Sequence, residues 1–97
     1  MDSAKSTAIQ QYLAGIFSDQ EIEQNYDFDR GAQHFKIRAP EGPLHLKITE
    51  EFIADHDTPE IIRRLNRWAV ADALRESKHM KYGVLVSESG LRQFSLS

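Results

Sequence analysis

The chain has 97 residues, no cysteine and a formal net charge of −3 at neutral pH. A chain of this length holds one hydrophobic core, so we expect a single domain that spans residues 1–97. Without cysteine there is no disulfide, thiolate nucleophile or cysteine-bound zinc, and the acidic balance disfavours a general nucleic-acid coat, which needs many cations to neutralise phosphates.

The amino-terminal stretch has an acid at its second position and no uninterrupted run of apolar residues. Signal peptides and membrane spans both need such a run. We therefore expect a cytoplasmic protein without a membrane partner.

Apolar residues between positions 9 and 17 recur at the spacing of one helical face. They are Ile9, Tyr12, Leu13, Ile16 and Phe17. The spacing predicts a helix over about residues 4–17, with Ser3 or Ser6 as its N-cap. The polar residues 18–20 end the pattern.

The next segment alternates apolar and polar residues, which is typical of a half-buried strand. The apolar set is Ile22, Tyr26 and Phe28. The polar set is Glu23, Asn25 and Asp27. Residues 29–31 then predict a turn.

Residues 34–49 carry the same basic and apolar pattern on both sides of Pro-Glu-Gly-Pro, and they predict a hairpin. If residues 40–43 form the turn, every apolar residue faces an apolar residue on the same side of the sheet. These inward pairs are Ala39 with Leu44, Ile37 with Leu46, and Phe35 with Ile48. The outward pairs are then Arg38 with His45, Lys36 with Lys47, and His34 with Thr49. The opposition of two lysines is expected to cost stability.

The residues Thr58-Pro59-Glu60 predict the start of a second helix, with Thr58 as N-cap, proline in the first helical position and an acid at the positive end of the helix dipole. This helix is expected to run to about Glu76. Its apolar face consists of Ile61, Ile62, Leu65, Trp68, Ala69 and Ala73. Val70 and Leu74 fall outside that face. Asp72 falls near its middle, where an unpaired carboxylate would be costly to bury.

The last part of the chain predicts a strand with Tyr82, Val84 and Val86 on one face, a turn over residues 87–90, and a short last strand or frayed tail. The predicted architecture is a two-layer α+β domain with an N-terminal helix, a three-stranded antiparallel meander, a long helix and a C-terminal strand or hairpin. Both helices would cover the apolar face of an antiparallel sheet. The other face would be open to water.

The polar face of the predicted hairpin carries a basic group that consists of Lys36, Arg38, His45 and Lys47. Acidic residues on the preceding strand can neutralise about half of this charge through cross-strand pairs, but none is expected beside Lys47 or His45. Two interpretations remain open. The group is either a solvated surface with exposed ion pairs of little weight, or a face that binds an anion or an acidic partner.

A second basic group, Arg63, Arg64 and Arg67, lies on the predicted long helix. These residues either suit the helix dipole and cover apolar surface with their stems, or form a ridge for a phosphate backbone or an acidic helix. Asp72 either pairs with Arg75 or the Trp68 indole, or marks the rim of a pocket.

The sequence contains no pattern typical of a metal, cofactor or catalytic site. Three adjacent polar residues at positions 55–57 cannot converge on one ion, and they are more typical of helix capping. His34 and His45 are diagonal neighbours, with no carboxylate placed to complete a site. A glycine-rich phosphate loop and a Gly-x-Ser-x-Gly elbow are both missing. We expect no bound metal and no cofactor, and the sequence identifies no catalytic residues, although acid-base catalysis by an ordinary Asp or Glu stays open as an alternative.

The sequence is best interpreted as a small cytoplasmic binding or regulatory module that acts through a protein partner. Stray apolar residues near the end of the sheet, Leu85, Val70 and Leu74, suggest a homodimer built on the last strand or on the outer side of the second helix. Two alternatives remain: a nucleic-acid-binding domain that uses either basic group, and a small enzyme with an unrecognised acid-base site.

Overall fold

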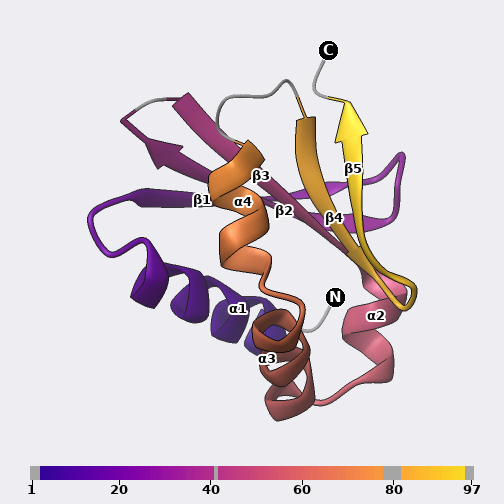
Figure 1. Cartoon of the computed structure of the whole chain (residues 1–97). Helices are drawn as coiled ribbons and strands as arrows, with labels where there is room; N and C mark the ends of the chain where they lie inside the picture. Colours follow the sequence, from indigo (N-terminus) through magenta and orange to yellow (C-terminus); the bar gives the residue numbers. More distant parts are fainter. Residues whose placement is uncertain (1–2, 41, 78–81, 96–97) are drawn as a thin grey trace.

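The computed structural model describes residues 3–40, 42–77 and 82–95. Within these ranges the elements, in chain order, are α1 (Ser3–Ile16), β1 (Glu21–Asp27), β2 (Ala32–Ala39), β3 (Gly42–Thr49), α2 (Glu50–Asp55), α3 (Thr58–Arg67), α4 (Val70–Ser77), β4 (Tyr82–Ser87) and β5 (Gly90–Ser95). The helices lie together on one side of a single sheet (Figure 1). The two-layer α+β architecture, with its meander and C-terminal hairpin, is confirmed.

The strands lie in the order β1-β2-β3-β4-β5, and the central pair, β3 and β4, is parallel. The expectation of a wholly antiparallel sheet was therefore wrong. Helices α2, α3 and α4 carry the chain back across the sheet before β4 begins, and such a crossover joins parallel strands. The sheet is mixed because an antiparallel meander and an antiparallel hairpin meet at one parallel pair.

The register of the β2–β3 hairpin differs from the predicted one by two residues. Gly42 already pairs with Ala39, so Ile37 faces Leu44 and Phe35 faces Leu46. Gly42 has a φ of 131°, a backbone conformation that glycine adopts readily and other residues rarely adopt. It allows a tighter turn than the four residues expected. A shift of two residues keeps every side chain on its predicted face.

This register also changes the neighbours of the basic residues. Lys47 lies opposite His34, and Lys36 lies opposite His45. The predicted opposition of Lys36 and Lys47 was wrong.

The second helix was predicted as one element, but it is broken between α3 and α4. Ala69 has a φ of 52°, and its amide donates to the carbonyl of Asn66 over 3.0 Å, which ends α3. Asp57, not Thr58, is the N-cap of α3, because its carboxylate accepts from the amide of Glu60.

The break between α3 and α4 turns the residues after it toward the sheet. Val70 and Leu74, which a continuous helix would place off the apolar face, are fully buried. They belong to the core and give no support to a dimer on the outer side of this helix.

Helix α2 was not predicted. It is six residues long, too short for a clear period, and its N-cap Thr49 accepts a hydrogen bond from the amide of Phe52. Phe52 and Ile53 are both buried. The connection after β3 is therefore part of the core.

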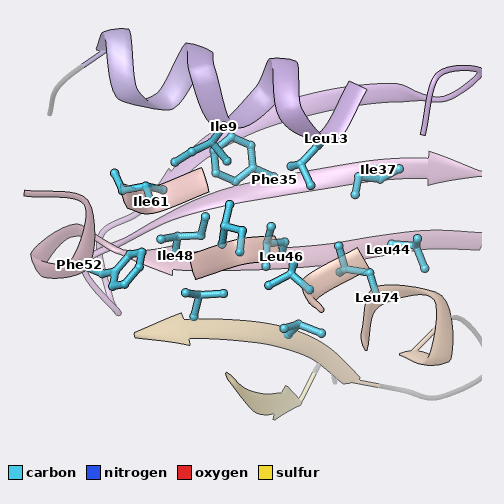
Figure 2. Packing of buried hydrophobic residues seen from close by; sticks show 14 of the residues in the cluster. Ile9, Leu13, Phe35, Ile37, Leu44, Leu46, Ile48, Phe52, Ile61 and Leu74 are labelled. Carbon is cyan, nitrogen blue, oxygen red and sulfur yellow. The ribbon is translucent and has the colours of Figure 1, made fainter. Parts of the chain in front are cut away.

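The core lies between the helices and the inner face of the sheet (Figure 2). The predicted core residues Ile9, Leu13, Phe35, Ile37, Leu46, Ile48 and Leu65 are all buried in it, with Trp68 partly buried against them. Full burial of one such side chain contributes roughly 1.5–3 kcal/mol. Phe28 is an exception: β1 ends at Asp27, and Phe28 is 86% exposed in the following turn.

None of the helices in the described ranges is long and apolar enough to cross a membrane.

Candidate functional site

The predicted site residues fall on opposite sides of the molecule. Lys36, Arg38, His45 and Lys47 lie on the outer face of β2 and β3, away from the helices. Arg63, Arg64 and Arg67 lie on α3, and Asp72 lies on α4. The fold therefore does not bring these residues into one site, and each group is described separately.

Both Arg38 and Lys47 on the outer face form ion pairs. Arg38 donates to Glu23 over 3.1 Å at an exposed site. The Lys47 ammonium lies 2.7 Å from the Asp27 carboxylate, and their side chains are only 13% and 18% exposed. Lys47 was expected to lack such a neighbour, and that expectation was wrong because Asp27 reaches across β2.

Asp27 also holds the β1–β2 turn. Its Oδ1 atom accepts hydrogen bonds from the amides of Asp29 and Arg30, while Oδ2 binds Lys47. The hydrogen bond from Lys47 is the main cause that holds the pKa of the Asp27 carboxyl below its ordinary value. One carboxylate thus fixes the turn and links β1 to β3.

An aromatic ring covers the part of the outer face over β4. Phe94 of β5 points to this side, is 6% exposed and lies over Gly83 of β4. The Lys47 ammonium lies 4.5 Å from the ring centroid, and the Arg30 guanidinium carbon lies 5.8 Å from it. The outer face was expected to be open to water, but these contacts cover its β3–β5 part.

His34 and His45 lie beside Lys47 on the same face. His34 Nε2 and His45 Nδ1 are 2.9 Å apart and share a hydrogen bond. Burial is the main cause that lowers the pKa of both imidazoles, with further contributions from nearby cations. We refer to Asp27, His34, His45, Lys47 and Phe94 together as the outer-face cluster.

Some cations of the outer face have no ion pair with any residue that the structure describes. Lys36 and Arg92 have no carboxylate within ion-pair distance among the residues that the structure describes. Arg92 of β5 lies opposite Leu85 of β4, and Leu85 in turn lies beside Lys47 of β3. The accessible positive charge of this face is therefore smaller than its composition indicates.

The arginines of α3 are mostly engaged in ion pairs. Arg63 and Arg64 both pair with Glu60, at 2.5 and 2.9 Å. Arg64 also lies 3.6 Å from Glu88, which binds His56 over 2.5 Å. This network links α3 to the β4–β5 turn. Arg67 is exposed, and no ion pair joins it to another described residue.

Asp72 is 74% exposed and lies 3.5 Å from Arg75. Because α4 is a separate helix, Asp72 is not on a buried face. It lies beside a hollow of about 400 Å³ between α1 and the α3–α4 break. Tyr12 donates a hydrogen bond to Asn66 at the side of this hollow.

A groove runs along the inner side of β5. Helix α4 packs against β3 and β4, so the last strand receives less cover from the helical layer. The groove has a volume of about 190 Å³. Its lining consists of Ala73, Glu76, Tyr82, Val84, Leu91, Arg92 and Gln93. Sequence reasoning missed it because Leu91 was assigned to a strand or a tail, without a defined face.

Among the residues that can be placed, no three histidine or carboxylate side chains are grouped to hold a metal ion. The two histidines of the outer-face cluster face lysines instead of a third ligand. The prediction of a metal-free protein stays a prediction.

No protein-family model matches the chain, and no curated protein or solved structure matches it either. Its function must be inferred from its own surfaces.

Proposed function

We propose that the chain is a small cytoplasmic binding module that acts through a protein partner, and that the partner binds at β5 and the groove beside α4. The observation that carries this proposal is the partly covered Leu91 at the end of the sheet, in a groove whose wall is α4. An apolar side chain at an open strand edge is a common site for the addition of an extended segment.

The composition of the two sheet edges favours β5 over β1. Strand β1 carries Glu21, Glu23 and Asp27, and charges of one sign discourage the pairing of a further strand. Strand β5 has no proline and Arg92 as its one charged residue. A partner strand would therefore meet less repulsion at β5.

The chemistry of β5 defines the partner segment. Its inward side chains should be apolar, to lie in the groove beside Leu91. An acidic residue on its outward side would meet Arg92, which lacks an ion-pair partner among the described residues. The proposed ligand is an extended segment with alternating apolar and acidic residues.

A second copy of the chain is another candidate for this position, and it keeps the proposal of a homodimer on the last strand. Antiparallel pairing of two β5 strands about Gln93 would place Arg92 beside Phe94 of the second copy. Pairing about Arg92 would instead oppose two like charges, which is unfavourable. Edge pairing of this kind is isologous and closes as a dimer.

Binding to nucleic acid is less well supported, because Arg38, Lys47, Arg63 and Arg64 are engaged in ion pairs. Affinity for phosphate backbones depends on many cations that are free to replace counterions.

The test is affinity capture with the full chain, its Leu91→Lys variant and the control Phe28→Lys, which adds the same charge at an exposed apolar residue after β1, away from β5. We expect Leu91→Lys to abolish capture of the partner and Phe28→Lys to retain it. Sedimentation of the unmodified chain identifies a homodimer. Capture of the partner by the Leu91→Lys variant would refute the proposal. Capture of a ligand that is lost only when nucleic acid is removed would also refute it.

A further inference from the structure

The imidazole pair of the outer-face cluster lies between two lysines. His34 of β2 lies directly opposite Lys47, and His45 of β3 lies directly opposite Lys36. The two rings are therefore diagonal neighbours, with centroids 5.1 Å apart. Each imidazole has a cation across the strand pair and another imidazole beside it.

The hydrogen bond between the rings limits how many protons they can hold. His34 Nε2 and His45 Nδ1 are 2.9 Å apart, so one nitrogen must donate and the other must accept. When both rings are protonated, all four ring nitrogens are donors and this bond cannot form. Two imidazolium ions at this distance would also repel each other.

The surroundings offer little compensation for added positive charge. From β1, Asn25 lies opposite His34. The Asp27 carboxylate favours the charged form of His34 and so raises its pKa, but Asp27 is already bound to Lys47, and burial and the nearby cations outweigh it. From β4, Gly83 and Leu85 are uncharged. From β5, Arg92 and Phe94 lie on the same face as the imidazoles, and the Arg30 guanidinium of the β1–β2 turn lies over the Phe94 ring. On β1, Glu23 is engaged by Arg38.

The cluster joins strands that are distant in the sheet order. Asp27 joins β1 to Lys47 on β3, the histidines join β2 to β3, and Lys47 contacts Phe94 on β5. The β1–β2 turn is thereby held toward the last strand on the outer face. Loss of the imidazole pair would remove one of these links and place further positive charge next to Lys47.

We propose that the outer-face cluster is a pH-sensitive latch, which closes the outer face at neutral pH and opens when protonation of both His34 and His45 breaks their hydrogen bond. In the open state the β1–β2 turn separates from Phe94, and the outer face presents Lys36, Lys47 and two imidazolium ions. A surface whose charge is partly neutralised by Glu23 and Asp27 at neutral pH thus becomes more strongly cationic in acid.

The direction of the pKa shifts agrees with this. Burial and nearby cations lower the pKa of both imidazoles below their ordinary value of 6.5. The stability that comes from the neutral pair is fully present above pH 6.5 and is lost as the pH falls through the lowered pKa values. In that window the folding equilibrium constant falls up to about tenfold per pH unit for each imidazole.

Ring-proton titration by NMR tests the coupling, with resonances assigned by the variants His34→Gln and His45→Gln. We expect both rings to titrate below 6.5, and the His34 midpoint to rise when His45 is replaced, because one cationic neighbour is removed. Independent titration of both rings near the ordinary value would overturn the proposal.

Urea unfolding at pH 7.5 and pH 5.0 tests the energetic effect. The unmodified chain should lose stability at pH 5.0, and the double variant His34→Gln/His45→Gln should lose much less. The control Asn25→Ser, which changes a neutral residue opposite His34, should keep the full loss. An equal loss in the double variant would overturn the proposal, and if that variant does not fold, the ring titration decides.

Local opening is distinguished from unfolding by two signals in the unmodified chain. Ala32 and Phe94 lie on the outer face, whereas Trp68 contacts the core from the helical layer. We expect the amide signals of Ala32 and Phe94 to shift with the histidine midpoint while the Trp68 indole signal stays constant. A simultaneous change of the Trp68 signal would mean global unfolding and would reject the latch.

Discussion

Ala69 has a backbone conformation that residues with a Cβ atom rarely adopt. Its φ of 52° is in the left-handed region, directly after the C-cap of α3. Glycine is the usual residue at this position of a helix end, because an L side chain there costs roughly 1–2 kcal/mol. The core contacts of Val70 and Leu74, which follow the break, offset this cost.

Ala69→Gly should therefore stabilise the protein by about 0.5–1 kcal/mol, measured by urea unfolding, since it relieves strain at the helix end. Ala71→Gly is the matched control. Residue 71 lies in the first turn of α4, where glycine should instead destabilise, by less than the roughly 1 kcal/mol of a helix interior. The same sign for both substitutions would contradict this account of the break.

Gly83 is required by a close approach. A Cβ atom at this position would lie 2.3 Å from Cζ of Phe94 and 2.9 Å from the carbonyl oxygen of His45. Gly83→Ala should cost about 1–3 kcal/mol of unfolding free energy, as overpacked sites do.

The contribution of the Phe94 ring to this cost can be isolated in a double-mutant cycle. In a Phe94→Ala background, Gly83→Ala should cost clearly less, because only the His45 carbonyl still opposes the new methyl group. An equal cost in both backgrounds would show that Phe94 does not lie over Gly83 in solution.

At the scale of elements, Lys47 of β3 connects its strand to β1 and β5, neither of which is adjacent to β3 in the sheet. It pairs with Asp27 of β1 and lies against Phe94 of β5. Lys47→Gln should lower the urea midpoint, since Asp27 loses its ammonium partner. Lys36→Gln is the control on the same face, and it should change stability by less than about 0.5 kcal/mol.

The pH dependence of Lys47→Gln gives a second measurement. The pKa of Asp27 is held below its ordinary value of 3.8, so the stability from its ionised form is present above that pH and lost as the pH falls through the lowered value. Part of this acid-dependent loss should vanish in Lys47→Gln. If Lys36→Gln has the larger effect, the assignment of Lys47 as the connecting residue is wrong.

The elements that could be predicted from the sequence are those in which local pattern and tertiary contact agree. The inward face of β2 and β3 followed from the alternation of apolar and polar residues. Phe35, Ile37 and Leu46 lie on one side of the sheet in every register that differs by an even number of residues. The register itself depends on Gly42 and the turn, and alternation cannot report a shift of two residues.

The helix break was missed because the apolar period alone favours one continuous helix. The stray positions of Val70 and Leu74 were the signal, since a bend after Ala69 buries both. A glutamine chain was also missed. Gln33 donates to Gln24, and Gln24 donates to Gln10 of α1. The sequence separations between these glutamines follow neither the helix nor the strand period, so the sequence pattern could not indicate the contacts.

For the whole molecule, the layer architecture followed from the apolar faces, whereas the candidate sites did not. Lys36, Arg38, His45 and Lys47 were correctly placed on one face, but their partners come from β1 and β5. Phe94 lies over the outer face only because Gly83 of the neighbouring strand has no side chain. The outer-face cluster thus depends on pairings that only the folded sheet brings together.

The parallel pair at the centre of the sheet determines the order in which a newly made chain assembles. The β1–β3 meander can form from neighbouring segments, but β3 cannot gain its second neighbour until residues 50–81 and β4 have been synthesised. At about 5–20 residues per second this interval lasts a few seconds, and the edge of β3 is open to other nascent chains throughout it. Once β4 pairs with β3, that edge is no longer available to other chains, so the C-terminal hairpin is expected to lower the tendency of the meander to aggregate.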